Sequence, residues 1–403
     1  MAPPPVPATK KKTRLRAALA VVLPMLGGAV LGVLGARYFP GLVPDRLFSG
    51  AELAVTTVVL AALLVVVVAI HEAGHLLGGR LAGFRALLFV VGPFRVERTG
   101  TGVRASLNRS AAVAGGLAVS VPEDTHDLRR RFLRMIAGGP AATLLTGSLA
   151  LALRGPLGLA SVPADAGFGR ALAAVALAVF GVGSLFIAAA TLVPARTGGF
   201  YSDGARILRL LRGGPDTDRE VAILALMALS MAGRRPREWD PALVALALGA
   251  ADGTSFDVVG RQLAYAHALD RDEPAEARRH LEAALALEEV LPPVVRPGLL
   301  LMAAYFAAAH DGDAARARAL FARAGTGLLV PAYVRLLAEA AVCLAEGDAR
   351  RAADLLERSE AQLGGTLDRG GGVADLERIR RLRALAAAAP AARPEEAHAG
   401  RSA

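Results

Sequence analysis

The residues between Glu52 and His71 include no charged side chain. As a helix rising ~1.5 Å per residue, this run covers about 28 Å, close to the ~30 Å thickness of the hydrocarbon core of a bilayer. Inside lipid, backbone N–H and C=O groups find no water, so a spanning segment of this kind must be a helix. The chain is therefore limited to folds in which at least one helix can cross a membrane.

Three further uncharged runs bring the predicted number of spans to about four. We expect them at about 17–36, 52–79, 132–153 and 171–194. Apolar residues make up 54% of the chain, and the excess is confined to the first half. This distribution predicts a mainly α-helical protein, in which a polytopic membrane bundle is followed by a soluble part.

Basic residues indicate the orientation of these spans. They concentrate before the first span, between the second and third, and after the fourth, whereas the other two connections hold a single arginine, Arg46. Cytoplasmic loops carry the excess of Lys and Arg in membrane proteins. We therefore expect a multi-pass protein of the cell membrane with both termini and the long middle loop in the cytoplasm.

The middle loop contains apolar and β-branched runs around the glycine-rich turn "RTGTG", which predicts a β-hairpin at about 86–108. The following residues, about 110–122, are apolar but too few to span. Two interpretations are open for them: a re-entrant or interfacial segment, or an ordinary strand packed on the hairpin.

From about residue 213 to 389 the pattern changes to amphipathic helices with short breaks. Three segments align at spacings near the tetratricopeptide period, with acidic, alanine and large apolar residues at matching offsets. This region resembles tetratricopeptide-like repeats and predicts a soluble helical repeat domain. The basic, proline-rich residues 1–15 and the tail 390–403 are expected to be disordered, which leaves 16–212 as the membrane domain.

The strongest chemical signal is "HEAGH", which begins at His71, directly after the uncharged run. On a helix, His71 and His75 lie one turn apart on the same face and can offer two nitrogens to one zinc ion. Glu72 is not needed as a ligand, so it is free to accept a proton from water. The competing interpretation, two histidines that merely cap a span, leaves Glu72 as a costly charge near the lipid.

A catalytic zinc site needs a third protein ligand. Two candidates lie on the same predicted side of the membrane, His126 in "PEDTHDLRRR" and Asp203 in "TLVPARTGGFYSDGARILRL". His126 could equally be a solvated loop residue. Asp203 could instead be the N-cap of the helix that follows it, and the local sequence does not choose between these roles.

These motifs resemble the site-2 protease family of intramembrane zinc metalloproteases over roughly residues 51–212. That family has an Asn-x-x-Pro-x-Pro-x-Leu-Asp-Gly motif, and its aspartate is the third zinc ligand. Here Thr191 stands in place of the asparagine and Pro194 matches. Ser202 replaces the leucine, the spacing is longer, and Asp203 with Gly204 closes the motif. "AGGPAATLL" is similar to the family's Gly-Pro-x-x-Asn element, with Thr143 in place of Asn.

The resemblance implies a zinc metalloendopeptidase in which His71, His75 and Asp203 hold Zn²⁺ and Glu72 is the catalytic base. The substrate would be a transmembrane or membrane-proximal segment of another membrane protein, cut near the cytoplasmic face. The helical repeats would bind a protein or peptide partner. A second hypothesis is an inactive scaffold anchored in the lipid bilayer, in which only the repeats act.

Other classes of protein fit poorly. Only 5% of residues are aromatic and the arginines are not interleaved with them, so we expect no nucleic-acid partner. Cys343 is the only cysteine, which excludes an intrachain disulfide and a cysteine-type zinc cluster. A transporter is disfavoured because the spans show no internal repetition.

Overall fold

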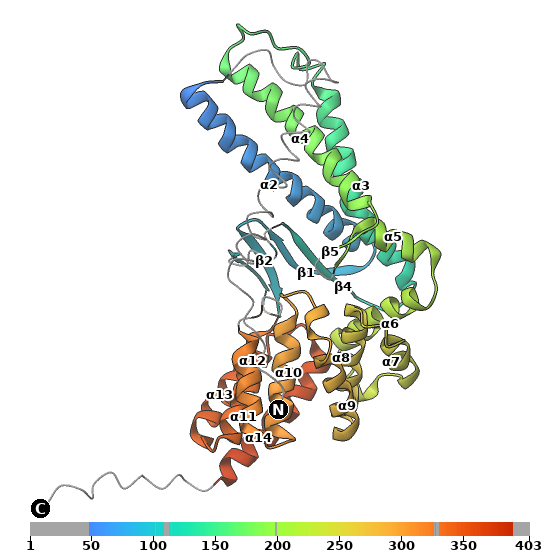
Figure 1. Ribbon diagram of the computed structural model, residues 1–403, viewed down its shortest axis with the longest axis vertical. Coiled ribbons are helices and arrows are strands. Elements are labelled where there is room, and N and C mark those ends of the chain that lie inside the picture. Colours follow the sequence, from blue (N-terminus) through green and yellow to red (C-terminus); the bar gives the residue numbers. More distant parts are fainter. Residues whose placement is uncertain are drawn as a thin grey trace, which may run out of the picture. The chain divides into compact units, whose positions relative to one another are not determined.

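The computed structural model describes residues 48–100, 102–108, 113, 115–197, 200–325, 327 and 330–389. The described part is mainly α-helical, with thirteen α-helices and a small antiparallel sheet (Figure 1). The predicted first span and the predicted disordered ends, 1–15 and 390–403, lie outside the described residues.

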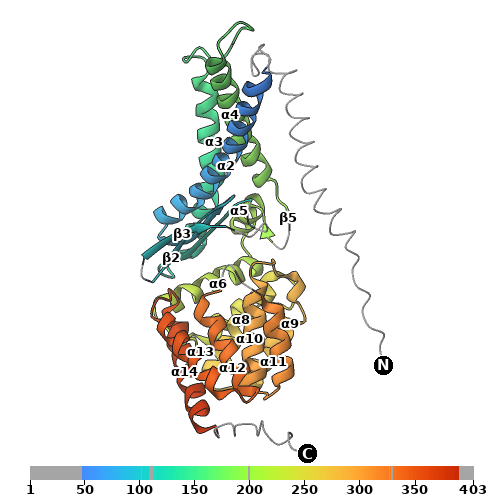
Figure 2. The ribbon, with the colours of Figure 1, turned by 90° about the vertical axis from the view of Figure 1, so that its left-hand side faces the viewer.

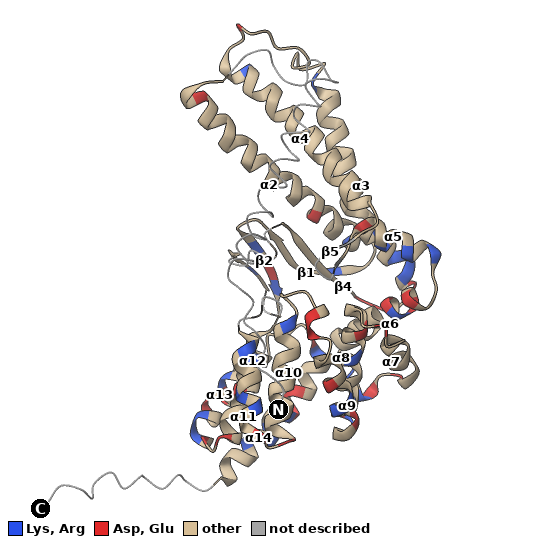
Figure 3. Ribbon diagram, viewed as in Figure 1, with Lys and Arg blue, Asp and Glu red and all other residues tan. Residues whose placement is uncertain are grey.

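Three of the described helices are long and apolar enough to cross a membrane: α2 (Gly50–Leu81), α3 (Leu128–Leu153) and α4 (Phe168–Leu192). They coincide with the predicted second, third and fourth spans to within a few residues. Charged side chains are sparse along them and numerous on the later helices (Figure 3). Their length and composition support membrane association of the chain.

Four strands form the sheet in the order β3-β2-β1-β4, all antiparallel. The strands are β1 (Phe84–Val91), β2 (Phe94–Thr99), β3 (Gly102–Leu107) and β4 (Leu117–Pro122). The predicted turn at "RTGTG" joins β2 to β3. The predicted single hairpin was too simple, because a second turn at Gly92 and Pro93 separates β1 from β2.

Strand β4 decides between the two interpretations for residues 117–122, while residues 110–112 and 114 of that segment lie outside the described residues. Leu117–Pro122 pair with β1 along its whole length, from Phe84 opposite Pro122 to Val90 opposite Leu117. These residues are therefore an ordinary strand. Its position at one end of the strand order leaves it an edge strand of this sheet.

The remaining elements follow α4. A two-stranded ribbon, β5 (Arg196–Thr197) with β6 (Phe200–Tyr201), leads into the helices. These are α5 (Asp203–Arg212), α6 (Pro215–Met231), α7 (Pro241–Leu248), α8 (Ser255–Asp270), α9 (Pro274–Leu285), α10 (Arg296–Ala309), α11 (Ala314–Ala324), α12 (Ala332–Ala345), α13 (Ala349–Leu363) and α14 (Arg369–Ala388).

The chain divides into two compact units. In the described residues one consists of positions up to Val67 together with Thr143–Phe186, and the other of Val68–Ala142 with everything from Ile187 on. The second unit therefore holds the end of α2, the first half of α3, the sheet and helices α5 to α14. All three predicted metal ligands belong to this unit.

Helices α8 to α13 pack as the consecutive pairs α8–α9, α10–α11 and α12–α13 (Figure 2). The second helix of each pair begins after one of the aligned acidic residues, Glu273, Asp313 and Asp348. The aligned alanines are fully buried where the paired helices meet: Ala277, Ala317 and Ala352. Val294, in the segment before α10, packs with Leu88 and Val90 of β1 and so joins these helices to the sheet.

Glycines bring α2 and α3 into backbone contact. A Cβ placed on Gly138 would lie 2.3 Å from the carbonyl oxygen of Gly74, and one on Gly74 would lie 2.4 Å from the oxygen of Gly138. Gly78 makes a similar approach to Arg134. Small residues allow such close crossings between helices in a membrane, so this contact fixes the spacing of α2 and α3 just where the histidines lie.

We expect Gly138→Ala to destabilise the protein by about 1–3 kcal/mol, because backbone atoms of α2 occupy the space of the new methyl group. Thermal unfolding of the purified protein in detergent measures this change. Gly183→Ala in α4 is the matched control, because no atom lies within 4 Å of its Cβ position, and it should shift stability by less than about 1 kcal/mol. Equal behaviour of the two variants would contradict the contact.

Candidate metal centre

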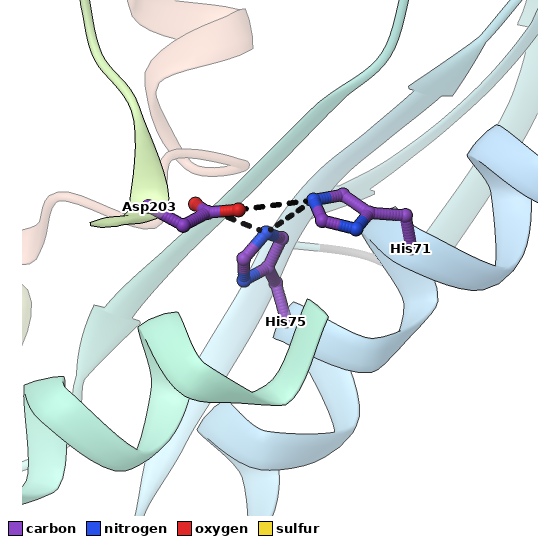
Figure 4. Close-up of side chains that lie close together, drawn as sticks. All are labelled: His71, His75 and Asp203. Atoms are coloured by element: carbon purple, nitrogen blue, oxygen red, sulfur yellow. Dashed lines mark hydrogen bonds and ion pairs between the residues drawn. The ribbon is translucent and has the colours of Figure 1, made fainter. Parts of the chain in front are cut away.

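The three predicted ligands converge in space although more than a hundred residues separate the histidines from the aspartate (Figure 4). Nε2 of His71 lies 3.1 Å from Oδ2 of Asp203 and 3.2 Å from Nε2 of His75. Nε2 of His75 lies 3.4 Å from the other carboxylate oxygen, Oδ1. One ligand atom from each residue can thus be chosen so that all three lie within 4.8 Å of one another.

Helix α3 orients His75. Its Nδ1 lies 3.2 Å from the carbonyl oxygen of Met135, which leaves Nε2 to face the other two residues. A Cβ on Gly139 would lie 2.3 Å from Nε2 of His75, so only glycine leaves room for the ring there. A second hydrogen bond of this kind fixes the tautomer and ring direction of metal-ligating histidines.

Asp203 is not the N-cap of the following helix. Ser202 has that role: its backbone is extended, with φ −63° and ψ 161°, and its side chain accepts a hydrogen bond from the N–H of Ala205. Asp203 is the first residue inside α5. The N-cap alternative that the sequence left open is therefore wrong, and the carboxylate of Asp203 is available to the histidines.

Gly204 is needed because α5 begins against the end of α4. A Cβ at this position would lie 1.8 Å from the carbonyl oxygen of Leu192, the last residue of α4. Pro194 follows two residues later, and helices usually end before a proline. Ser202 also joins the two ends, because its Oγ accepts from the N–H of Ala195 at 2.9 Å and donates to the carbonyl oxygen of Val193 at 2.7 Å.

The position of α5 is supported from α3. Arg129 donates to the carbonyl oxygens of Leu210 and Leu211 at 2.7 and 3.0 Å, which satisfies acceptors at the C-terminal end of α5. Leu210 itself is buried with Phe132 of α3. The same helix α3 therefore orients His75 and holds the helix that begins with Asp203.

The histidines determine the charge state of Asp203. Burial by itself would raise the pKa of this carboxyl, but hydrogen bonds to His71 and His75 outweigh burial and hold its pKa well below the usual range. Asp203 is therefore ionised at neutral pH. An ionised carboxylate opposite two imidazole nitrogens is a suitable arrangement for a cation.

Glu72 lies beside this group and faces strand β4. A Cβ on Gly116, which precedes β4 and has φ +113°, would lie 2.6 Å from Oε1 of Glu72. The backbone of Ala118 in β4 also lies near the Glu72 carboxylate. The edge of the sheet thus lies next to Glu72, the predicted proton acceptor.

His126 is exposed in the loop between β4 and α3, where the guanidinium of Arg131 binds its carbonyl oxygen at 2.8 Å. Arg131 also donates to the carbonyl oxygens of Ala82 and Gly83, which completes the C-terminal end of α2. Among the described residues, the group able to hold a metal consists of His71, His75 and Asp203. The structure therefore places Asp203 beside the two histidines and leaves His126 apart from them.

Several residues of the site carry no signal that sequence reasoning used. The carbonyl of Met135, Gly116 and Ala118 act through the backbone, which the side-chain pattern does not reveal. Gly139 lies in "AGGPAATLL" and Ser202 departs from the family motif, but neither pattern predicts their contacts in the site. The hydroxyl of Thr191, in place of the motif's asparagine, donates to the carbonyl oxygen of Ala188 at 3.3 Å.

The donor set fits zinc. Two imidazole nitrogens and a carboxylate are ligands that catalytic zinc sites use, with a further position left for water or substrate. Nδ1 of His75 already has the outer partner that a zinc-ligating histidine requires, whereas Nδ1 of His71 is buried without one among the described residues. Comparisons with protein-family models, with curated proteins and with solved structures find no match to this chain.

We expect Asp203→Ala to purify with far less zinc than the wild type, because two ligands do not hold a catalytic zinc. Metal analysis by mass spectrometry of the purified protein gives the stoichiometry. His126→Ala is the matched control and should retain the wild-type zinc content. Full zinc in Asp203→Ala, or loss of zinc in His126→Ala, would show that the third ligand was assigned to the wrong residue.

Proposed function

We propose that this chain is an intramembrane zinc metalloendopeptidase of the site-2 protease type, which cleaves a segment of another membrane protein near the cytoplasmic face. The observation that supports it most is the convergence of His71, His75 and Asp203, with Glu72 next to them. An ionisable group at the end of an apolar helix is costly unless a cation or water compensates it. This set is arranged for a cation.

The chemistry assigned to the residues is amide hydrolysis. A zinc ion held by the three ligands would polarise the scissile carbonyl and lower the pKa of water. Glu72 accepts a proton from the attacking water and passes it to the leaving amine. Asp203 stays ionised and neutralises positive charge, and the hydrogen bond that Nδ1 of His75 donates to the carbonyl oxygen of Met135 keeps the ring directed at the site.

The position of the motif restricts the substrate. His71 follows about 28 Å of uncharged helix, so the site would lie at or just inside the cytoplasmic edge of the bilayer. A soluble protein does not reach that depth, whereas a transmembrane segment of another protein does. The scissile bond must be extended, because a helix uses its carbonyls in internal hydrogen bonds.

Strand β4 is suited to hold such an extended segment. It is an edge strand of the sheet and begins directly after Gly116, which lies against Glu72, so a peptide added along that edge would lie beside the proposed catalytic carboxylate. The β2–β3 hairpin also exposes large apolar side chains on one face: Phe94, Val96, Val103 and Leu107. Cross-strand pairing of Phe94 with Leu107 makes this surface continuous, as expected of a hairpin that rests in the membrane interface.

A second candidate function is a membrane-anchored scaffold without activity. The helical pairs from α8 to α13, arranged as in a tetratricopeptide-like domain that binds protein partners, favour it. Zinc content separates the two hypotheses, because a scaffold needs no metal. Retention of two histidines, a glutamate and an aspartate in one group favours the peptidase.

We expect Glu72→Gln to lower cleavage at least about a hundredfold while zinc content and folding persist, since general-base catalysis contributes about 10²–10⁴-fold. Quantitative proteomics of cells that carry this variant in place of the wild type should show stabilised membrane proteins, the substrates among them. Glu52→Gln makes the same change at the other end of α2 and is the control. Unchanged turnover of every membrane protein in Glu72→Gln would exclude the assigned role.

We expect Gly116→Ala to lower cleavage of such a substrate by up to about a hundredfold with zinc retained, because the methyl group would push Glu72 aside. The neighbouring Gly115→Ala is the control, since nothing lies within 4 Å of its Cβ position. The ratio of cleavage rates at equal zinc content measures the effect. Equal rates in the two variants would mean that Gly116 does not position Glu72.

A further inference from the structure

Helix α14 crosses one face of the paired helices instead of extending the row. It packs on α12 and α13 and also returns to α6. Its buried residues Ile379 and Leu382 belong to the same core as Tyr265 of α8 and Tyr305 of α10. Helix α14 thus closes a core to which the first helix of each pair contributes.

Polar groups of α14 are directed at tyrosines on that surface. The hydroxyl of Tyr333 in α12 donates to Oδ2 of Asp375 at 3.1 Å. Arg378, one turn later, donates to the other oxygen of Asp375 at 2.6 Å. Burial raises the pKa of the Tyr265 and Tyr305 hydroxyls, and the positive charge of Arg378 opposes that shift.

The contact of α14 is more polar than contacts among the paired helices. Its buried apolar side chains are few: Ala374, Ile379 and Leu382. By contrast α10 buries almost every side chain it has. Further polar contacts hold α14 at its margins: Ser230 donates to Asp368 at 2.5 Å, and Arg235 pairs with Glu377 at 2.8 Å. Permanent interfaces are mostly apolar, whereas exchangeable ones are more polar.

The segment before α14 is a short turn that contains Gly364 and Gly365, where an added Cβ would meet no atom closer than 3.6 Å. The carbonyl oxygen of Gly365 accepts a hydrogen bond from the N–H of Gly100 at 2.7 Å, and release of α14 requires this turn to change while α13 stays in place. Glycines in a short connection give it conformational freedom. The surface that α14 covers therefore resembles a binding groove occupied by a helix of the same chain.

We propose that the face of α8, α10 and α12 that carries Tyr265, Tyr305 and Tyr333 is a helix-binding groove, and that α14 exchanges there with an amphipathic helix of a partner protein. The pattern of α14 defines that partner: a carboxylate, an arginine three residues later, and aliphatic residues four and seven positions after the carboxylate. The two charged groups satisfy each other and the tyrosine hydroxyl, which a purely apolar helix cannot do. This inference does not depend on peptidase activity.

A fluorescent peptide of residues 369–388 tests the groove in the full-length protein. We expect Arg378→Ala to bind the peptide at least about tenfold more tightly than the wild type does, because its own α14 competes less well. The matched control Arg380→Ala alters the exposed face of α14 and should bind like the wild type. A peptide that carries Arg378→Ala itself should bind tenfold more weakly.

Hydrogen exchange on the wild type tests the proposal without a destabilised variant. Saturating peptide should accelerate exchange of the resident α14 at least about tenfold and leave α10 unchanged. If Arg378→Ala keeps its helical circular dichroism and yet binds no peptide, the groove does not exchange its helix. If that variant fails to fold, the wild-type arm decides, and unchanged exchange of α14 at saturating peptide overturns the proposal.

Discussion

The backbone contact of Gly74 with Gly138 is the constraint on which the candidate centre depends. It brings α2 and α3 so close that Gly139 lies against the ring of His75 and the carbonyl of Met135 reaches its Nδ1. A wider spacing would separate His75 from the carbonyl oxygen that orients its ring. Packing of α2 against α3 therefore keeps the residues at the end of the apolar helix in the arrangement that the candidate centre needs.

The candidate third ligand, Asp203, comes from an independent part of the chain, and separate contacts hold it in place. Ser202 caps α5, Arg129 binds its other end, and Gly204 allows α5 to begin against α4. Each anchor uses a backbone group at a helix end, where donors and acceptors lack partners. The contacts that satisfy backbone groups at the ends of α5 thus also place the carboxylate of Asp203 opposite the two imidazoles.

The sequence predicted those parts of the site that follow from spacing along one helix. His71 and His75 had to share a face, and the uncharged runs covered by α2, α3 and α4 had to be helical. The N-cap role of Ser202 and the neighbours of Glu72 could not be predicted. They depend on where backbone groups of β4 and α4 lie, and distances between segments far apart in sequence leave no periodic signal.

The two-stranded ribbon of β5 and β6 limits the effect of length changes in the connection between α4 and α5. Its ends are pinned, because Ser202 bonds to Val193 and Ala195 and Gly204 abuts Leu192. Residues added between those points project away as a hairpin and leave the carboxylate of Asp203 where it was. A longer spacing between Pro194 and Asp203 than in the motif that this chain resembles therefore need not displace the carboxylate, so motif spacing is a poor measure of where that carboxylate lies.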